Sequence, residues 1–187
     1  MKDRSQKKVR YFILPIALLI AAFLIGCSPA ANLDEPPEIL YGEDVCDECS
    51  MIINEERFAA SYVTTTGEVR RFDDVGGMLL HDQKHQEDVH VYWVHDFDTK
   101  DWIDAEEAVF VLDEGLMTPM GWSLAPFATQ EQAETYVSEN SGIIADFVML
   151  QQEIADGKLD PTTLSTHQHE DEMGEGMEDH DMESGGE

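Results

Sequence analysis

The sequence predicts an α+β fold built from short strands with a few helices between them. Short apolar runs are separated by clusters of Gly, Pro and Thr, and residues that start helices follow several of these runs. Segment 67–72 begins with Gly, ends with Phe and precedes a predicted helix, and segment 142–147 repeats that pattern. Two related β-rich halves would explain this repeated Gly–Phe pattern, and so would chance.

Five segments have the alternation or apolar content of strands, and a sixth follows the clearest helix. They are 58–63, 68–72, 89–94, 108–112, 122–127 and 143–147. The Thr-Thr-Thr-Gly stretch 64–67 joins the first two as a hairpin. Pro126 lacks a backbone N–H, so its strand is expected at a sheet edge. His90 and His95 are expected at exposed strand positions.

Three segments are expected to be helical, each from its start and stop signals. Asp73 precedes the first, which runs through 75–79. Thr129 opens the second and is followed three residues later by Gln, which is the form of a capping box. Gly142 ends this helix, and residues 148–155 form the last one.

The first 27 residues have the pattern of a secretory signal. Five basic residues precede the apolar run 11–25, which is short for a membrane-spanning helix. The run ends in Leu-Ile-Gly-Cys at 24–27, which looks like a bacterial lipobox whose Cys27 is lipidated. The alternative is an uncleaved membrane anchor. Either places the rest of the chain outside the cytoplasm and tethered to a membrane.

The composition changes twice behind this signal. Residues 28–37 are small, polar and proline-rich, which is typical of a flexible tether. Residues 38–156 carry the apolar patterning of a folded body. Residues 157–187 lose that patterning and are expected to form a disordered, acidic tail rich in His and Met.

The charge of the chain is strongly negative. Its 187 residues hold 11 Lys and Arg against 40 Asp and Glu, a net charge of −29. Five of the basic residues and one acidic residue lie in 1–27, so residues 28–187 hold six and 39, or −33. Such a surface repels a phosphate backbone, which excludes nucleic acid as a partner. Solubility explains this acidity, and so does attraction to cations or to a basic partner.

The chemistry of the body concentrates in a C-x-x-C-x-M motif. Cys46 and Cys49 are followed at once by Met51. Three interpretations compete: a structural disulfide, a redox dithiol and a soft-metal site. Thiolate and thioether together select Cu(I) over zinc, magnesium or calcium. In an extended segment Cys49 and Met51 would point to the same side, and Cys46 would close the site from the preceding turn.

Further methionines favour copper. Met117 and Met120 flank a Pro-Gly turn, where a thioether is an unusual choice for a surface, and Met120 is the better candidate ligand. Met78 is expected in the core instead. The tail adds donors that suit copper or other divalent ions, or that are incidental to a solubilising tail. They are His167, His169, Met173, Met177, His180 and Met182.

Enzymatic function is not expected. The pair His81 and His85 has helical spacing, but no Glu lies between them as in H-E-x-x-H. The sequence has no G-x-S-x-G motif, no P-loop and no dinucleotide-binding fingerprint.

Five blocks in a fixed order behind the lipobox resemble the NosL family, the accessory lipoproteins of nitrous oxide reductase. They are C-x-x-C-x-M at 46–51, FDDVGGML at 72–79, TKDWIDA at 99–105, TPMGW at 118–122 and FAT at 127–129. The resemblance covers about residues 38–156. It implies two small, similar ββαβ-type halves, which we expect at about 38–86 and 87–156.

The resemblance also implies a function and a site. NosL proteins are described as monomeric Cu(I) metallochaperones for the copper–sulfur centre of nitrous oxide reductase, acting with a membrane ABC-type assembly complex. Their C-x-M pair matches Cys49 and Met51, Cys46 matches an additional cysteine of many members, and Met120 matches a later methionine. Ser50 departs from the commoner Gly, which matters if that position needs a positive φ.

The alternative function is an extracytoplasmic thiol-disulfide oxidoreductase that uses Cys46 and Cys49. A third possibility is a membrane-anchored interaction domain held by a structural disulfide. The copper interpretation predicts that Cys49→Ser and Met51→Leu each weaken Cu(I) binding more than deletion of residues 167–187 does.

Overall fold

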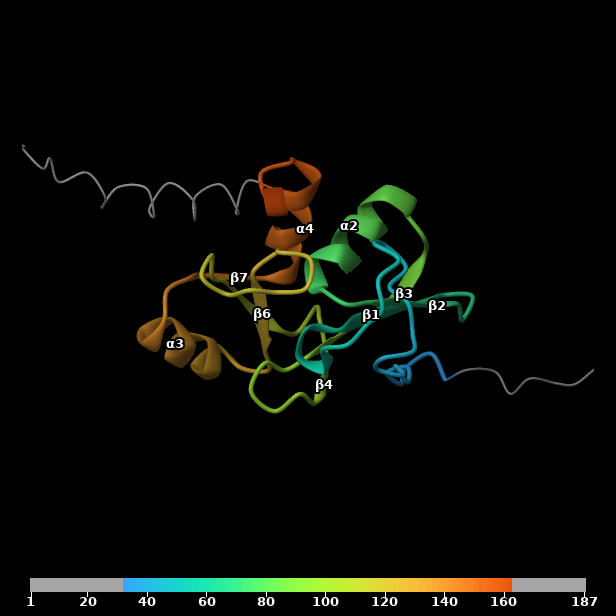
Figure 1. Ribbon diagram of the computed structural model, residues 1–187, viewed down its shortest axis with the longest axis horizontal. Helices are drawn as coiled ribbons and strands as arrows, with labels where there is room; N and C mark the ends of the chain where they lie inside the picture. The colour runs from blue at the N-terminus through green and yellow to red at the C-terminus, as the bar shows by residue number, and fades with distance from the viewer. Residues whose placement is uncertain (1–31, 163–187) are drawn as a thin grey trace, which may run out of the picture. The chain divides into compact units, whose positions relative to one another are not determined.

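The computed structural model describes residues 32–162, which belong to one compact unit (Figure 1). In this part of the chain it contains two antiparallel sheets, three α-helices and a short 3₁₀ helix, η1 (Glu56–Phe58). The predicted signal peptide, the lipidated Cys27 and the tail from residue 163 onward lie outside the described residues.

The first sheet has four strands in the order β2-β1-β3-β4. They are β2 (Val69–Phe72), β1 (Ala60–Thr64), β3 (Val89–His95) and β4 (Trp102–Asp104), and every neighbouring pair is antiparallel. Helix α2 (Val75–His85) connects β2 to β3 and packs on β1 and β2.

The second sheet has three strands in the order β6-β5-β7. They are β6 (Leu124–Phe127), β5 (Val109–Leu112) and β7 (Ile143–Ala145), again antiparallel. Helix α3 (Gln130–Glu139) connects β6 to β7, and α4 (Phe147–Ala155) follows β7 and packs against α2 (Figure 1).

The expected ββαβ repeat is confirmed by this topology. In both halves a hairpin is followed by a helix and by a third strand that pairs with the first strand of the hairpin. Phe72 ends β2 opposite Ala60, and Phe127 ends β6 opposite Val109, so these two phenylalanines are equivalent. The repeated Gly–Phe pattern in the sequence instead paired Phe72 with Phe147, which is the first residue of α4.

The strands change sheet later than the sequence indicated. We expected the halves to divide after residue 86, but β3 and β4 complete the first sheet and the second sheet begins at Val109. Strand β4 was not predicted, because its three residues are too few for a recognisable alternation.

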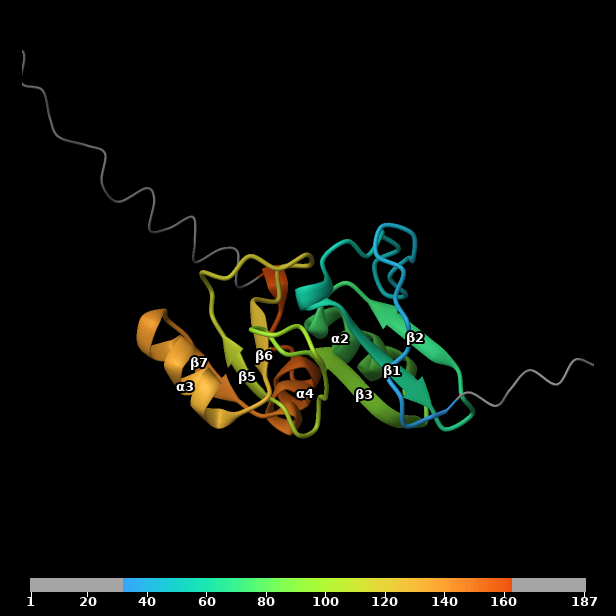
Figure 2. The same ribbon diagram turned by 90° about the horizontal axis from the view of Figure 1, so that it is seen from below.

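The second sheet is covered on both faces. Figure 2 shows its strands between α3 and α4. Val111, Ala125 and Phe127 pack with Ala133 of α3, whereas their strand neighbours face the main core. That core joins residues of both halves, including Tyr62, Phe72, Met78, Phe110, Trp122, Leu124 and Phe147.

Most predicted element boundaries are close to those observed. The strand expected at 58–63 begins two residues later, because η1 occupies the residues before it. Pro126 lies on an edge strand, as predicted. Helix α3 ends with Asn140 as its cap, so Gly142 is not its stop. Gly142 is needed for close packing instead, since a Cβ there would lie 2.6 Å from a methyl carbon of Val111.

Candidate metal centre

The C-x-x-C-x-M motif forms a closed loop at the edge of the first sheet. Val45 and Ile52 make an antiparallel bridge at its base. Inside it, the Cys46 N–H donates to the Met51 carbonyl at 2.8 Å. These contacts reverse the chain between the first cysteine and the methionine.

The expectation of an extended segment was therefore wrong. The Ser50 N–H donates to the Cys46 carbonyl at 2.9 Å, and Ser50 has a φ of 62°. This is the left-handed region that favours glycine. Cys49 and Met51 consequently lie on either side of a sharp bend rather than along a strand.

Asp47 docks this loop on strand β2. Its N–H donates to the Arg71 carbonyl at 2.9 Å, and its Oδ2 accepts from the Arg71 N–H at 2.7 Å. These two hydrogen bonds attach the loop to the outer edge of β2. The loop is thereby held beside the residues that follow β2.

Cys46, Cys49 and Asp73 come together at the point where β2 passes into α2. Their ligating atoms all lie within 4.8 Å of one another. The Cys49 Sγ lies 3.6 Å from both carboxylate oxygens of Asp73, and the Cys49 N–H points to the Cys46 Sγ at 3.5 Å. Both thiols are free. Asp73 was expected as a helix cap, but Asp74 takes that role and accepts from the Gly76 N–H.

The two cysteines differ in their access to solvent. Cys46 is 1% exposed, and burial raises the pKa of its thiol to about 12. Cys49 is partly exposed. An incoming ion or protein therefore meets Cys49 first, with Cys46 behind it.

Met120 is held at the same end of α2. Asp74 accepts hydrogen bonds from the Thr118 hydroxyl at 2.5 Å and from the Met120 N–H at 3.1 Å. The Met120 Sδ lies against Gly77, where an added Cβ would approach it to 2.6 Å. Asp73 and Asp74 are adjacent in the chain. This dipeptide therefore connects the cysteine loop on one side with the Met120 turn on the other.

The remaining methionines separate as predicted into core and surface. Met78 is fully buried, and Met117 is 85% exposed. Met51 is half-exposed beside two other exposed apolar side chains of the loop, Val45 and Ile52. The loop that carries Cys49 therefore exposes three apolar side chains, Val45, Met51 and Ile52, which together are called the apolar rim here.

The histidines of the first half take different positions. His90 is exposed, as expected, and pairs with Asp34 at 2.7 Å. His95 was expected to be exposed, but it is 1% exposed. Its Nδ1 lies 3.0 Å from the Ala59 carbonyl, and its ring packs on Trp102 of the unpredicted strand β4. His81 and His85 gather with Glu48, a residue that the sequence did not single out.

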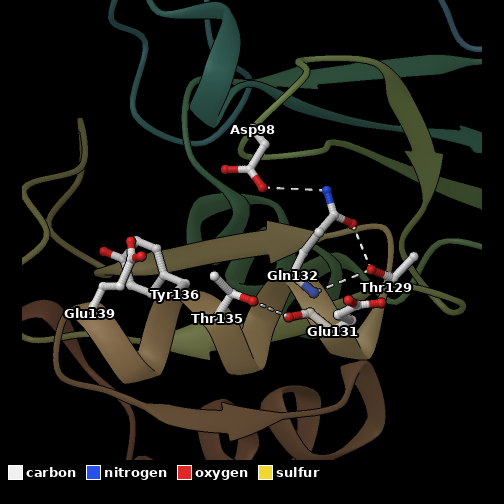
Figure 3. Close-up of a pocket in the computed structure, with 7 residues that line it drawn as sticks. All are labelled: Asp98, Thr129, Glu131, Gln132, Thr135, Tyr136 and Glu139. Atoms are coloured by element: carbon white, nitrogen blue, oxygen red, sulfur yellow. Dashed lines mark hydrogen bonds between the residues drawn. The ribbon is translucent and has the colours of Figure 1, made fainter.

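A separate hollow of about 290 Å³ runs along α3 and carries no thiol, thioether or imidazole (Figure 3). Its lining residues are Asp98, Thr129, Glu131, Gln132, Thr135, Tyr136 and Glu139. Gln132 donates its N–H to the Thr129 hydroxyl, as a capping box requires, but turns its amide nitrogen to Asp98. This hollow has oxygen donors only and does not suit a soft metal.

The chain matches the family model of NosL over residues 37–155, which is well over half of its length. The chain belongs to the NosL family. Copper-binding lipoprotein NosL of Stutzerimonas stutzeri is 27% identical over 150 residues, which cover 73% of this chain and 78% of that protein.

A solved structure has the same fold. It is the copper chaperone NosL from Shewanella denitrificans, with a TM-score of 0.54 at 20% identity, covering 60% of this chain and 93% of that chain. The resemblance inferred from five sequence blocks and the α+β fold class are thus confirmed. Within residues 32–162 of this NosL-family chain, none of the helices has the length and apolar content to cross a bilayer.

Proposed function

We propose that this protein is a membrane-anchored, extracytoplasmic Cu(I) metallochaperone that delivers copper for maturation of the copper–sulfur centre of nitrous oxide reductase. One observation carries the proposal. Two free thiols converge in a loop that also carries the half-exposed Met51, in a chain of the NosL family. A relative in that family is named a copper-binding lipoprotein.

Cu(I) would be held first by the Cys49 thiolate and the Met51 thioether. Cys46 is close enough to Cys49 to add a second thiolate from the buried side. Met120 is the fourth candidate, because its sulfur is fixed at the same end of α2. Soft sulfur donors of this kind select Cu(I) over harder ions.

The exposure of Cys49 and Met51 suits transfer rather than storage. A low-coordinate ion keeps an open position, which a His or Met of a partner enters by ligand exchange. The apolar rim supplies a contact surface around that position, and the acidic remainder of the chain orients docking on a basic partner. No bond of a substrate is made or broken, so the protein is a carrier and not an enzyme.

The localisation that we propose rests on the predicted lipobox, and the partners rest on the NosL family. A lipidated Cys27 would confine the protein to the membrane surface on the extracytoplasmic side. The partners we propose are nitrous oxide reductase, its ABC-type assembly complex, or both, met by a monomeric carrier. The tail donors His167, His169 and His180 with their neighbouring methionines would raise the local copper concentration.

An anaerobic Cu(I) titration against a Cu(I)-specific chelator tests the site. The chain from Ser28 to Glu187 is compared with Met51→Leu and with Met117→Leu, a matched control whose thioether is 85% exposed. We expect one tight equivalent, weakened about tenfold or more by Met51→Leu and unchanged by Met117→Leu. Equal behaviour of the two variants would place the copper elsewhere.

The same preparation separates the carrier from a thiol-disulfide oxidoreductase. We expect no turnover of a disulfide substrate, and Ile52→Lys should slow copper transfer to a partner without changing Cu(I) affinity. Sustained disulfide exchange that survives Met51→Leu would overturn the carrier assignment.

A further inference from the structure

A second cluster of metal-ligating side chains lies along α2, away from its N-terminal end. It consists of Glu48, His81 and His85, whose ligating atoms all lie within 4.8 Å of one another. Glu48 belongs to the cysteine loop, between Cys46 and Cys49, but it turns to the later half of α2. The two histidines are four residues apart and therefore share one face of that helix.

The cluster is held in place by packing. The side chains of Glu48 and His81 are each only 9% exposed. The His81 ring packs against Phe72 and Tyr62 of the first sheet, with ring centroids 5.2 and 6.2 Å away. His85 stacks on His81 at 4.1 Å and is exposed, which leaves its ring able to rotate. Two members are thus fixed and one is adjustable.

The spacing within the cluster is that of ligands around an ion. The His81 Nδ1 lies 3.1 Å from the Glu48 Oε2. Two ligand atoms that each lie about 2.1 Å from a metal are separated by roughly 3.0–3.4 Å in octahedral or tetrahedral geometry. A metal ion can therefore take the place of the hydrogen bond between this nitrogen and this oxygen, and a rotation of His85 supplies the third donor.

We propose that Glu48, His81 and His85 form a second metal site, for a divalent ion such as Zn(II) or Cu(II). Two imidazoles and one carboxylate are the donors that these ions prefer, whereas Cu(I) prefers the sulfurs of the cysteine loop. Lys84 also contacts the Glu48 carboxylate. It limits the affinity of the site, since it must give up part of that contact when the ion enters. This inference is independent of the proposed Cu(I) function.

The test is a Zn(II) titration, competed against a chromophoric chelator, of the chain from Ser28 to Glu187. His167, His169 and His180 are first replaced by Ala so that the tail does not contribute. In this background we expect one equivalent of Zn(II), weakened about tenfold or more by His85→Ala. The matched control is His90→Ala. It removes an exposed histidine that also pairs with a carboxylate, but that belongs to no group of three ligating residues within 32–162. Circular dichroism confirms that both variants remain folded.

Two further variants separate this site from the thiols and from a plain ion pair. Zn(II) binding should persist in Cys46→Ser/Cys49→Ser, and Lys84→Met should strengthen it severalfold by removing a competing cation. Cu(II) added to the Cys→Ser variant should show nitrogen coupling in its electron paramagnetic resonance spectrum, and His85→Ala should reduce it. Equal Zn(II) affinities of His85→Ala and His90→Ala would overturn the proposal. So would loss of Zn(II) with the cysteines, which would place the ion on the thiols.

Discussion

The two ββαβ halves of this molecule share one frame, but only the first supplies the two cysteines of the candidate copper site. Phe72 and Phe127 end equivalent strands, and two residues later Asp74 and Thr129 cap equivalent helices. Between them lie Asp73, which is 2% exposed beside Cys49, and its exposed counterpart Ala128. The candidate copper site therefore depends on residues that the first half has and the second half lacks.

The caps of α2 and α3 also differ in the hydrogen bonds that they accept. Thr129 caps α3 locally, through the Gln132 N–H. Asp74 caps α2 and also accepts from Thr118 and Met120, which are 44 and 46 residues later in the chain. The first half thus uses its cap to bring a distant turn to the site, whereas the second half uses its cap only to start a helix.

The largest predicted difference in stability concerns the second residue of α2 and of α3. A Cβ at Gly76 would lie 2.0 Å from the ring of the buried Trp122, so Gly76→Ala should destabilise the fold by more than about 3 kcal/mol. Its counterpart is Glu131, which is exposed, and Glu131→Ala should cost about 0.5 kcal/mol or less. Urea denaturation of both variants measures this. Similar losses would mean that Trp122 can move away from α2.

Removal of the caps of α2 and α3 should give the next largest difference in stability between the halves. Asp74→Ala loses a helix cap and leaves the Thr118 hydroxyl and the Met120 N–H without their acceptor, which should cost about 3 kcal/mol. Thr129→Ala removes only a helix cap, which should cost about 1 kcal/mol of stability. The Cu(I) affinity of the folded fraction adds a second readout: it should fall in Asp74→Ala, through Met120, and stay constant in Thr129→Ala.

Only the cap of the first half should respond to pH. Burial raises the pKa of Asp74 to about 6, above its ordinary value of about 3.9. Between those two values the folded state keeps a proton that the unfolded state has released. The contribution of Asp74 to stability is therefore largest below about pH 4 and falls by roughly 2–3 kcal/mol as the pH rises to 6.

Comparison with Asp74→Asn isolates that contribution, because the amide does not titrate. The difference in unfolding free energy between the natural chain and this variant should shift against the natural chain from pH 4 to pH 6 and then level off. A constant difference over this range would show that Asp74 ionises normally in the folded state.

The smallest effects concern the two left-handed turns that position the methionines. Ser50 precedes Met51 with a φ of 62°, and Gly121 follows Met120 with a φ of 77°. Ser50→Gly should stabilise the fold by about 1 kcal/mol and Gly121→Ser should destabilise it by a similar amount. Thermal unfolding distinguishes the two, and Cu(I) affinity should change in neither. Destabilisation by Ser50→Gly would mean that the serine makes a contact that outweighs its backbone strain.

The sequence by itself determined the local elements and the kind of chemistry. Strands, the Thr129 cap and the edge position of Pro126 follow from alternation, side-chain hydrogen bonding and a missing N–H, all of which act over a few residues. The C-x-x-C-x-M motif and the order of five blocks indicated a NosL-family copper protein, because donor softness is a property of residue type.

Only the tertiary structure decided which side chains meet. The convergence of Asp73 with Cys49, the burial of His95 under Trp102, and the gathering of Glu48 with His81 each join segments separated by 7 to 33 residues. Such contacts depend on sheet order and on which side of a strand or loop faces the core. A local pattern does not encode these. In the sequence, Glu48 in particular is one acidic residue among many. Only the fold of its loop against α2 places it beside two histidines.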